Sequence, residues 1–118
     1  MADAFVTPTH GEGFGRPIVE AMAMELPTIA TNWSGPAAFL GEAWSYPLPI
    51  KGLVAADRGN GKWADVAEES VVQLMEHVLA HPEERRAKAK AARAYVLAHF
   101  SESVIADQLL NILEEVVR

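Results

Sequence analysis

Two glutamates near the start of the chain have the residue type and spacing to hold a ligand rich in hydroxyl groups. Glu12 and Glu20 are separated by seven residues. A carboxylate accepts hydrogen bonds from two neighbouring hydroxyls, which is the contact that recognition of a sugar or a ribose requires. Because Glu12 falls in a loop and Glu20 one turn into the following helix, both side chains could face one cleft. For Glu20 a simpler role also stays open. A carboxylate near a helix N-terminus is stabilised by the helix dipole, so Glu20 could serve only to stabilise the helix.

Three glycines in the same loop could let an anionic group approach the main chain. Gly11, Gly13 and Gly15 have no Cβ, so the backbone there can come close to a ligand and adopt unusual φ angles. The helix expected from Arg16 onward aims its unbonded N–H groups at this loop, which favours an anion such as phosphate. The alternative is that the glycines only make a tight strand-to-helix turn. The spacing fits neither a dinucleotide fingerprint, which needs glycine where Arg16 stands, nor a phosphate loop, which needs GK[ST].

The elements that would position this loop form a βαβ unit. Apolar and β-branched runs predict buried strands at Ala4–Thr7 and Thr28–Thr31, and helical spacing predicts a helix over Arg16–Leu26 between them. In open parallel sheets ligands bind at the carboxyl ends of the strands. The loop from Pro8 to Gly15 therefore lies where a ligand site is expected.

The remaining sequence is expected to complete a small α/β fold. Pro36–Leu40 predicts a short helix, Trp44–Ile50 an edge strand or extended segment because of its prolines, and Lys51–Lys62 a mobile loop. Helices follow over Ala67–Ala80, from Pro82, and after a Ser101 N-cap. The apolar stripe of the last helix is expected to be buried and comprises Ile105, Leu109, Ile112, Leu113 and Val116. The predicted fold is a partial Rossmann-like domain with about three parallel strands flanked by helices and a helical C-terminal third.

Composition narrows the class of protein. The 118 residues suffice for one domain, and an apolar fraction of 50% argues against disorder. A net charge of −6 disfavours nonspecific binding to nucleic acid, which needs a basic face. No apolar run approaches the ~20 residues of a membrane span. No secretory segment follows the first methionine, so a cytoplasmic location is expected.

Three weaker candidates have plain structural alternatives. His77 and His81 stand four apart, a spacing compatible with a metal, but no third ligand is in sight and a surface pair is expected, with no metal site. The basic residues within 85–93 are interleaved with alanine, which favours a solvated helix face. His10 either lines the pocket of the glutamate loop or is simply exposed.

Residues 2–31 resemble the signature of retaining GT-B glycosyltransferases of the family-4 type, also described as glycosyl transferases group 1. The hallmark of that family is E-x7-E within P-[ST]-x-x-E-G-F-G-x-P-x-x-E-A-M-A, and residues 8–23 read PTHGEGFGRPIVEAMA without a gap. Further on, Ser34-Gly35 stands where the family has a Gly-Gly pair. His81–Arg86 and Phe100-Ser101 resemble the family's C-terminal helices.

The resemblance implies a role for each residue of the loop. Glu12 would be the catalytic glutamate in contact with the donor sugar, and Glu20 would bind the ribose of the nucleotide. The donor sugar and its diphosphate would lie against Gly13, Phe14, Gly15 and Arg16. The nucleoside-diphosphate sugar is then a substrate, and no cofactor is expected.

The resemblance also implies that residues 1–118 form an incomplete C-terminal segment of the donor-binding domain. Such enzymes have two Rossmann-like domains, and the N-terminal one binds most of the acceptor. The expected function is transfer of a sugar from a nucleoside-diphosphate sugar to an acceptor in the full enzyme, with the missing N-terminal part as partner. A bare sheet edge and apolar surface would make the isolated chain self-associate. The alternative is a non-catalytic nucleotide-sugar-binding or assembly module, inactive alone.

Overall fold

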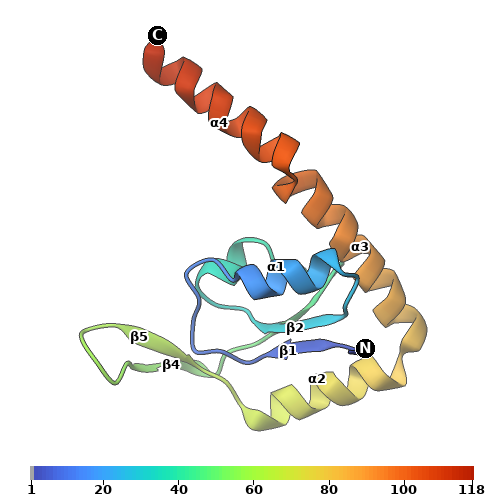
Figure 1. Ribbon diagram of the computed structural model, residues 1–118. Helices are drawn as coiled ribbons and strands as arrows, with labels where there is room; N and C mark the ends of the chain where they lie inside the picture. The colour runs from blue at the N-terminus through green and yellow to red at the C-terminus, as the bar shows by residue number, and fades with distance from the viewer. Residues whose placement is uncertain (1) are drawn as a thin grey trace.

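A three-stranded parallel sheet lies at the centre of the computed structural model, which describes residues 2–118 (Figure 1). The strands are β1 (Phe5–Thr7), β2 (Thr28–Thr31) and β3 (Tyr46–Leu48), paired in the order β1-β2-β3. The register aligns Val6 with Ile29 and Ile29 with Tyr46. Strand β2 is buried along its whole length, while β3 is an edge strand and so tolerates a proline at Pro47. The predicted α/β fold is confirmed.

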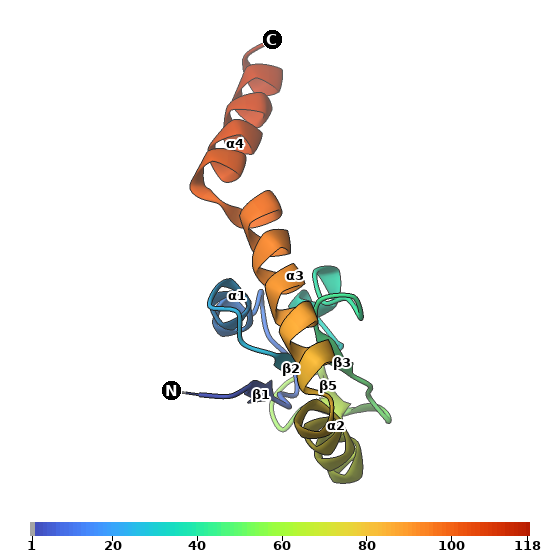
Figure 2. The ribbon, with the colours of Figure 1, turned by 90° about the vertical axis from the view of Figure 1, so that its right-hand side faces the viewer.

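Helices cover both faces of the sheet and supply two apolar clusters. Helices α1 (Arg16–Ala23) and α3 (Pro82–Phe100) cover one face, and α2 (Glu68–Ala80) covers the other (Figures 1 and 2). The short 3-10 helix η1 (Gly35–Ala38) follows β2, where a short helix is predicted. The cluster under α1 and α3 is built on Ile18, Met22, Ala30, Phe39, Ala92 and Val96. The cluster under α2 is built on Ile29, Tyr46, Leu48 and Val78.

Helix α1 ends three residues earlier than predicted because the chain reverses there in a Schellman motif. The amide of Leu26 donates to the Ala21 carbonyl at 3.1 Å, and the amide of Glu25 donates to the Met22 carbonyl at 3.1 Å. This reversal places Glu25 at a φ of 55°, in the left-handed region that glycine usually occupies at helix ends. The Arg93 guanidinium donates to the Ala23 carbonyl at 2.6 Å and ties this end of α1 to α3.

The prediction of a loop over residues 51–62 is wrong at 52–55 and at Lys62, which lie in strands, and correct for the turn at 56–61. The structure has an antiparallel hairpin there, made of β4 (Gly52–Ala55) and β5 (Lys62–Asp65), with Val54 opposite Trp63. A turn with Gly59 at a φ of 83° joins the strands. All of β4 is exposed, so the hairpin has little of the apolar alternation that reveals a half-buried strand.

The last helix, α4 (Glu102–Val117), has the predicted periodicity but not the predicted burial. It extends away from the sheet, and none of its residues is buried (Figure 1). Its apolar residues include Leu109 at 55%, Ile112 at 57% and Val116 at 78% exposure. The predicted burial is wrong because apolar periodicity determines which residues share a helix face but not whether another part of the protein covers that face. Ser101 precedes α4, although its side chain makes no capping hydrogen bond.

Over residues 2–118 the structure contains no helix with the length and apolar character needed to cross a lipid bilayer.

Candidate functional site

The loop between β1 and α1 reaches α1 through a glycine that no other residue could replace without strain. Gly15 is the N-cap of α1 with a φ of 96°, and it is buried. A Cβ there would lie 3.1 Å from both the Ile18 side chain and the Pro36 ring. The Gly15 carbonyl accepts the first helical hydrogen bonds, from the amides of Ile18 at 3.0 Å and Val19 at 3.3 Å. For Gly15, the tight-turn interpretation is therefore sufficient.

Gly13 differs, because its surroundings are open. A Cβ at Gly13 would meet no atom within 4 Å. Among residues 2–118, the main-chain N–H groups of residues 13–16 have no protein acceptor. Such unbonded donors at a helix N-terminus are suited to bind an anion.

The side chain of Phe14 contributes to packing. It is 46% exposed, and its ring lies 5.3 Å from that of Phe39 and 5.5 Å from that of Phe100. Aromatic rings at these separations attract one another beyond their burial. Phe14 thereby anchors the loop to Phe39, which follows η1, and to the end of α3.

The main chain of Glu12 is held by the turn that follows β2. The Glu12 carbonyl accepts hydrogen bonds from Ser34 Oγ at 2.8 Å and from the Gly35 amide at 3.1 Å. The Glu12 carboxylate, in contrast, has no hydrogen-bond or ion-pair partner within the described part of the chain. The loop is therefore fixed in place, and the partly buried carboxylate keeps its full capacity to accept hydrogen bonds.

Glu20 and Arg16 are both on the surface of α1. Arg16 Nη2 lies 3.9 Å from Glu20 Oε1, with side-chain exposures of 84% and 68%. The first turn of α1 contains no acidic residue, so Glu20 lies too far from the helix N-terminus for the helix dipole to stabilise it. The simpler role considered from the sequence is therefore excluded for Glu20. An exposed pair at this distance is worth little to stability, which leaves the Glu20 carboxylate available to a ligand.

His10 connects the loop to the hairpin that the sequence did not predict. The His10 carbonyl accepts from the Ala64 amide at 2.9 Å, and His10 Nδ1 lies 2.9 Å from the Ala64 carbonyl. The His10 ring stacks on Trp63 with centroids 5.0 Å apart. Of the two interpretations for His10, the structure shows an exposed side chain engaged in packing against β5. The signal that could have found this strand is the apolar pair Trp63-Ala64 after a glycine turn.

A groove of about 940 Å³ lies apart from this site. It is lined by residues before β1 and β2, by the end of α1 and by α3, among them Asp3, Glu25, Arg85, Arg86 and Lys90. These residues mark the amino ends of the parallel strands, whereas the glutamate loop follows the carboxyl end of β1. The groove is therefore not part of the candidate site.

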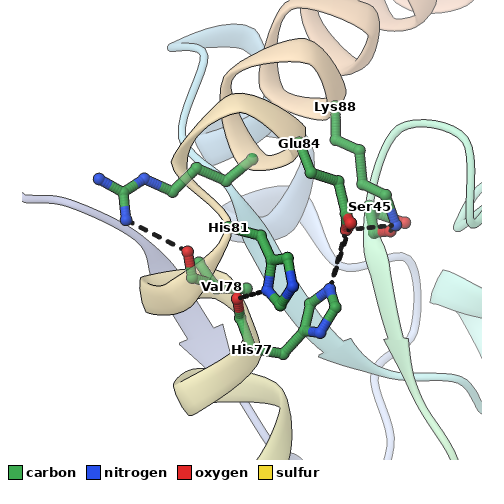
Figure 3. Close-up of polar contacts among 7 residues, drawn as sticks. Ser45, His77, Val78, His81, Glu84 and Lys88 are labelled. Atoms are coloured by element: carbon green, nitrogen blue, oxygen red, sulfur yellow. Dashed lines mark hydrogen bonds and ion pairs between the residues drawn. The ribbon is translucent and has the colours of Figure 1, made fainter.

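A second polar cluster joins α2 to α3 (Figure 3). His77 Nε2 lies 3.1 Å from Glu84 Oε1, and Lys88 Nζ lies 3.5 Å from the same oxygen. The hydrogen bond from His77, with further help from Tyr46 and Lys88, lowers the pKa of Glu84. Burial, with the nearby Glu84 carboxylate, raises the pKa of Tyr46 to about 12.

The two histidines of this cluster have structural roles. His77 is paired with Glu84, and His81 Nδ1 donates to the His77 carbonyl at 2.8 Å (Figure 3). Their rings stack with centroids 4.0 Å apart. Within residues 2–118, no group of three or more histidine, cysteine or acidic side chains could hold a metal ion.

The sequence model of the family described as glycosyl transferases group 1 matches residues 1–71. That match spans more than half of the chain. The chain belongs to this family. Among solved structures, a glycosyltransferase from Rickettsia africae ESF-5 superposes on 99% of the chain with a TM-score of 0.72 and 20% identity. The glycosyltransferase fold is thus shared along almost the whole length of residues 1–118.

Curated proteins match shorter parts of the chain at higher identity. Sucrose synthase from Solanum tuberosum is 46% identical over 56 residues, which are 46% of this chain and 7% of that protein. The capsular polysaccharide biosynthesis glycosyltransferase CapM from Staphylococcus aureus is 54% identical over 33 residues, or 28% of this chain and 9% of CapM. The chain spans less than a tenth of these curated relatives, and the match covers 28% of the Rickettsia africae structure.

Proposed function

We propose that this chain carries part of the donor site of a glycosyltransferase that moves a sugar from a nucleoside-diphosphate sugar to an acceptor. The observation that carries the proposal is the set of unbonded amides over residues 13–16, next to the unpaired carboxylate of Glu12. The amides suit a diphosphate, and the carboxylate suits the hydroxyls of a sugar. Membership in glycosyl transferases group 1 agrees with this chemistry.

Each residue of the loop has a distinct role in the proposal. Glu12 is the catalytic residue and contacts the donor sugar, and Glu20 binds the ribose. Gly13 lets the ligand approach the main chain, because nothing occupies the space in front of it. The amides of Phe14, Gly15 and Arg16, with the dipole of α1, stabilise the charge that develops on the departing nucleoside diphosphate. The nucleotide sugar is the substrate, and no cofactor takes part.

The same proposal describes residues 1–118 as the C-terminal segment of a donor-binding domain. The relatives that match are more than ten times as long as the matched segments, so most of their residues have no counterpart here. We expect an N-terminal part of the enzyme to bind the acceptor and to supply the remaining contacts to the donor. That part is the main protein partner in the proposal.

A titration with nucleotide sugars tests donor binding directly. The chain labelled with ¹⁵N is titrated with UDP-, GDP- and ADP-glucose, and the amide shifts of residues 12–20 are followed. We expect shifts confined to this segment, and weaker binding in Glu12→Gln and Glu20→Gln. Glu76→Gln, an exposed change on α2, is the matched control and should bind as the wild type does. If no amide shift appears at millimolar concentrations of any of the three nucleotide sugars, donor binding by this chain is refuted.

One observation favours a second candidate, a non-catalytic assembly module. Helix α4 presents an exposed apolar face that contributes nothing to the core. An apolar face of this kind marks a surface for association with another helix or chain. Self-association without any donor-induced amide shift would favour this candidate over the donor site.

A further inference from the structure

The turn after β2 contains a strained residue. The roles proposed above for residues 8–15, the loop between β1 and α1 that we call the donor loop, do not explain it. Ser34 has a φ of 64° and a ψ of −144°. Residues with a side chain are rarely found in this region, which belongs almost entirely to glycine. A non-glycine residue persists there only when its surroundings compensate for the strain, and such residues gather at functional sites.

The compensation for Ser34 is a hydrogen bond to the donor loop. Ser34 Oγ donates to the Glu12 carbonyl at 2.8 Å, and the Gly35 amide donates to the same oxygen at 3.1 Å. A carbonyl oxygen has two lone pairs, so the two donors together satisfy it. Glycine at position 34 would relieve the strain but would leave Glu12 with only one of these donors.

The turn that makes this clamp is itself fixed to the sheet. The Asn32 amide donates to the Leu48 carbonyl of β3 at 2.9 Å, and the Trp33 amide donates to the Thr31 carbonyl at 2.9 Å. The Cα of Gly35 packs against the carbonyl of Gly13, where a Cβ would overlap the oxygen. Ser34 therefore links the donor loop to a rigid part of the fold.

We propose that Ser34 is a positioning residue of the donor site. It holds the main chain of Glu12 so that the carboxylate of Glu12 and the amides of residues 13–16 are presented together. The inference rests on the proposed function, and it deepens that function by adding a residue outside the glutamate loop. The serine at position 34 accepts backbone strain that a glycine would not have, and in return it supplies a second hydrogen-bond donor to the Glu12 carbonyl.

Two variants separate positioning from stability. Ser34→Ala keeps the strain and removes the hydroxyl, whereas Ser34→Gly removes both. We expect lower hydrogen-exchange protection of the Gly35 amide, which donates to the Glu12 carbonyl at 3.1 Å, in both variants. UDP should bind about threefold to tenfold more weakly, the range expected for one lost hydrogen bond. Ser34→Gly should show this loss with an unchanged or higher Tm. Ser103→Ala on exposed α4 is the matched control and should match the wild type in all three measurements.

The outcomes decide the inference independently of the proposed function. If Ser34→Gly binds UDP as tightly as the wild type and protects the Gly35 amide equally, Ser34 has no positioning role. If UDP, GDP and ADP all fail to bind the wild type, the proposed function fails, and exchange of the Gly35 amide still decides whether Ser34 holds the loop. Lower protection of the Gly35 amide in Ser34→Gly at unchanged or higher Tm supports positioning, and unchanged protection overturns it. Because Ser34→Gly relieves strain, it remains usable even if Ser34→Ala does not fold.

Discussion

The Cα of Gly35 lies against the carbonyl of Gly13, so that a Cβ at position 35 would overlap the Gly13 oxygen and lie 2.9 Å from the carbonyl oxygen of Glu12. Two segments that are 22 residues apart in the sequence are thereby held in main-chain contact. The loop between β1 and α1 depends on this contact for its shape, because within residues 2–118 the Gly35 amide makes the one main-chain hydrogen bond from this turn to the Glu12 carbonyl.

Gly35→Ala should destabilise the protein, since the added methyl group meets main-chain atoms that cannot rotate away. Overpacking of this kind costs about 1–3 kcal/mol and more where backbone must shift. Urea unfolding followed by circular dichroism measures the change. Gly52→Ala is the control, because a Cβ at Gly52 meets nothing within 4 Å. Equal midpoints for the two variants would contradict the packing described here.

Gly13→Ala should have the opposite profile, with stability retained and ligand binding reduced. A Cβ at Gly13 meets no protein atom within 4 Å, so the folded chain accepts it. The methyl group would stand in the space that the proposed donor occupies. Calorimetric titration with UDP and a thermal melt measure the two effects. Unchanged UDP affinity would place the ligand elsewhere.

Glu25→Gly should stabilise the protein, because Glu25 occupies the left-handed position at the end of α1. An L-residue in this conformation costs about 1–2 kcal/mol relative to glycine. The exposed contact between Arg93 Nε and Glu25 Oε1, at 3.9 Å, offsets little of that gain. For a chain of this size, a gain of about 1 kcal/mol raises Tm by roughly 4 °C. Glu25→Gln removes only the charge and should leave Tm close to that of the wild type, whereas a lower Tm for Glu25→Gly would refute the argument.

Glu84→Gln should make the free energy of unfolding less dependent on pH below pH 4.5. The hydrogen bond from His77 lowers the pKa of Glu84 below its ordinary value of 4.5. A lowered folded pKa stabilises the protein above pH 4.5, and this contribution disappears as the pH falls through the folded value. Wild-type stability from urea unfolding should therefore decrease more steeply below pH 4.5 than that of Glu84→Gln. Glu83→Gln, a change at a neighbouring exposed carboxylate, should keep the wild-type slope.

The isolated chain should self-associate through α4. Its exposed apolar residues repeat at heptad spacing, with Ile105, Leu109, Ile112 and Val116 on one seam. Sedimentation velocity should show a mass that rises with concentration, and Leu109→Glu with Ile112→Glu should abolish the rise. Gln108→Glu with Asn111→Glu adds the same charge to polar positions and should have a smaller effect. A chain that is monomeric at every concentration would contradict this prediction.

The parts of the fold that the sequence predicts correctly are those with local signals. Apolar and β-branched runs predict β1 and β2, and helical apolar spacing predicts α1. The prolines at Pro47 and Pro82 predict an edge strand and a helix start. The glycine loop is recognised because Gly15 needs a conformation that few residues adopt. The roles of Glu12 and Glu20 stay predictions that the proposed titrations test.

The parts that were missed depend on contacts between distant segments. Ser34 acts on Glu12 across 22 residues, and no local pattern indicates a hydrogen bond at that separation. The hairpin is fixed to the loop by His10 and Ala64, which are 54 residues apart. Burial of α4 was wrongly predicted because an apolar stripe specifies a surface and not its partner.

The extension of α4 from the sheet also bears on the cooperativity of folding. The Cα radius of gyration is 16.3 Å, against about 13–14 Å for a compact domain of this length. A helix without buried residues shares little stabilising surface with the rest of the molecule. Its amides should therefore exchange through local opening, whereas those of β2 should exchange only when the whole domain unfolds. Helix α4 and the rest of the domain should therefore unfold as two separate cooperative units of one polypeptide chain. A partner that covers α4 would couple their unfolding.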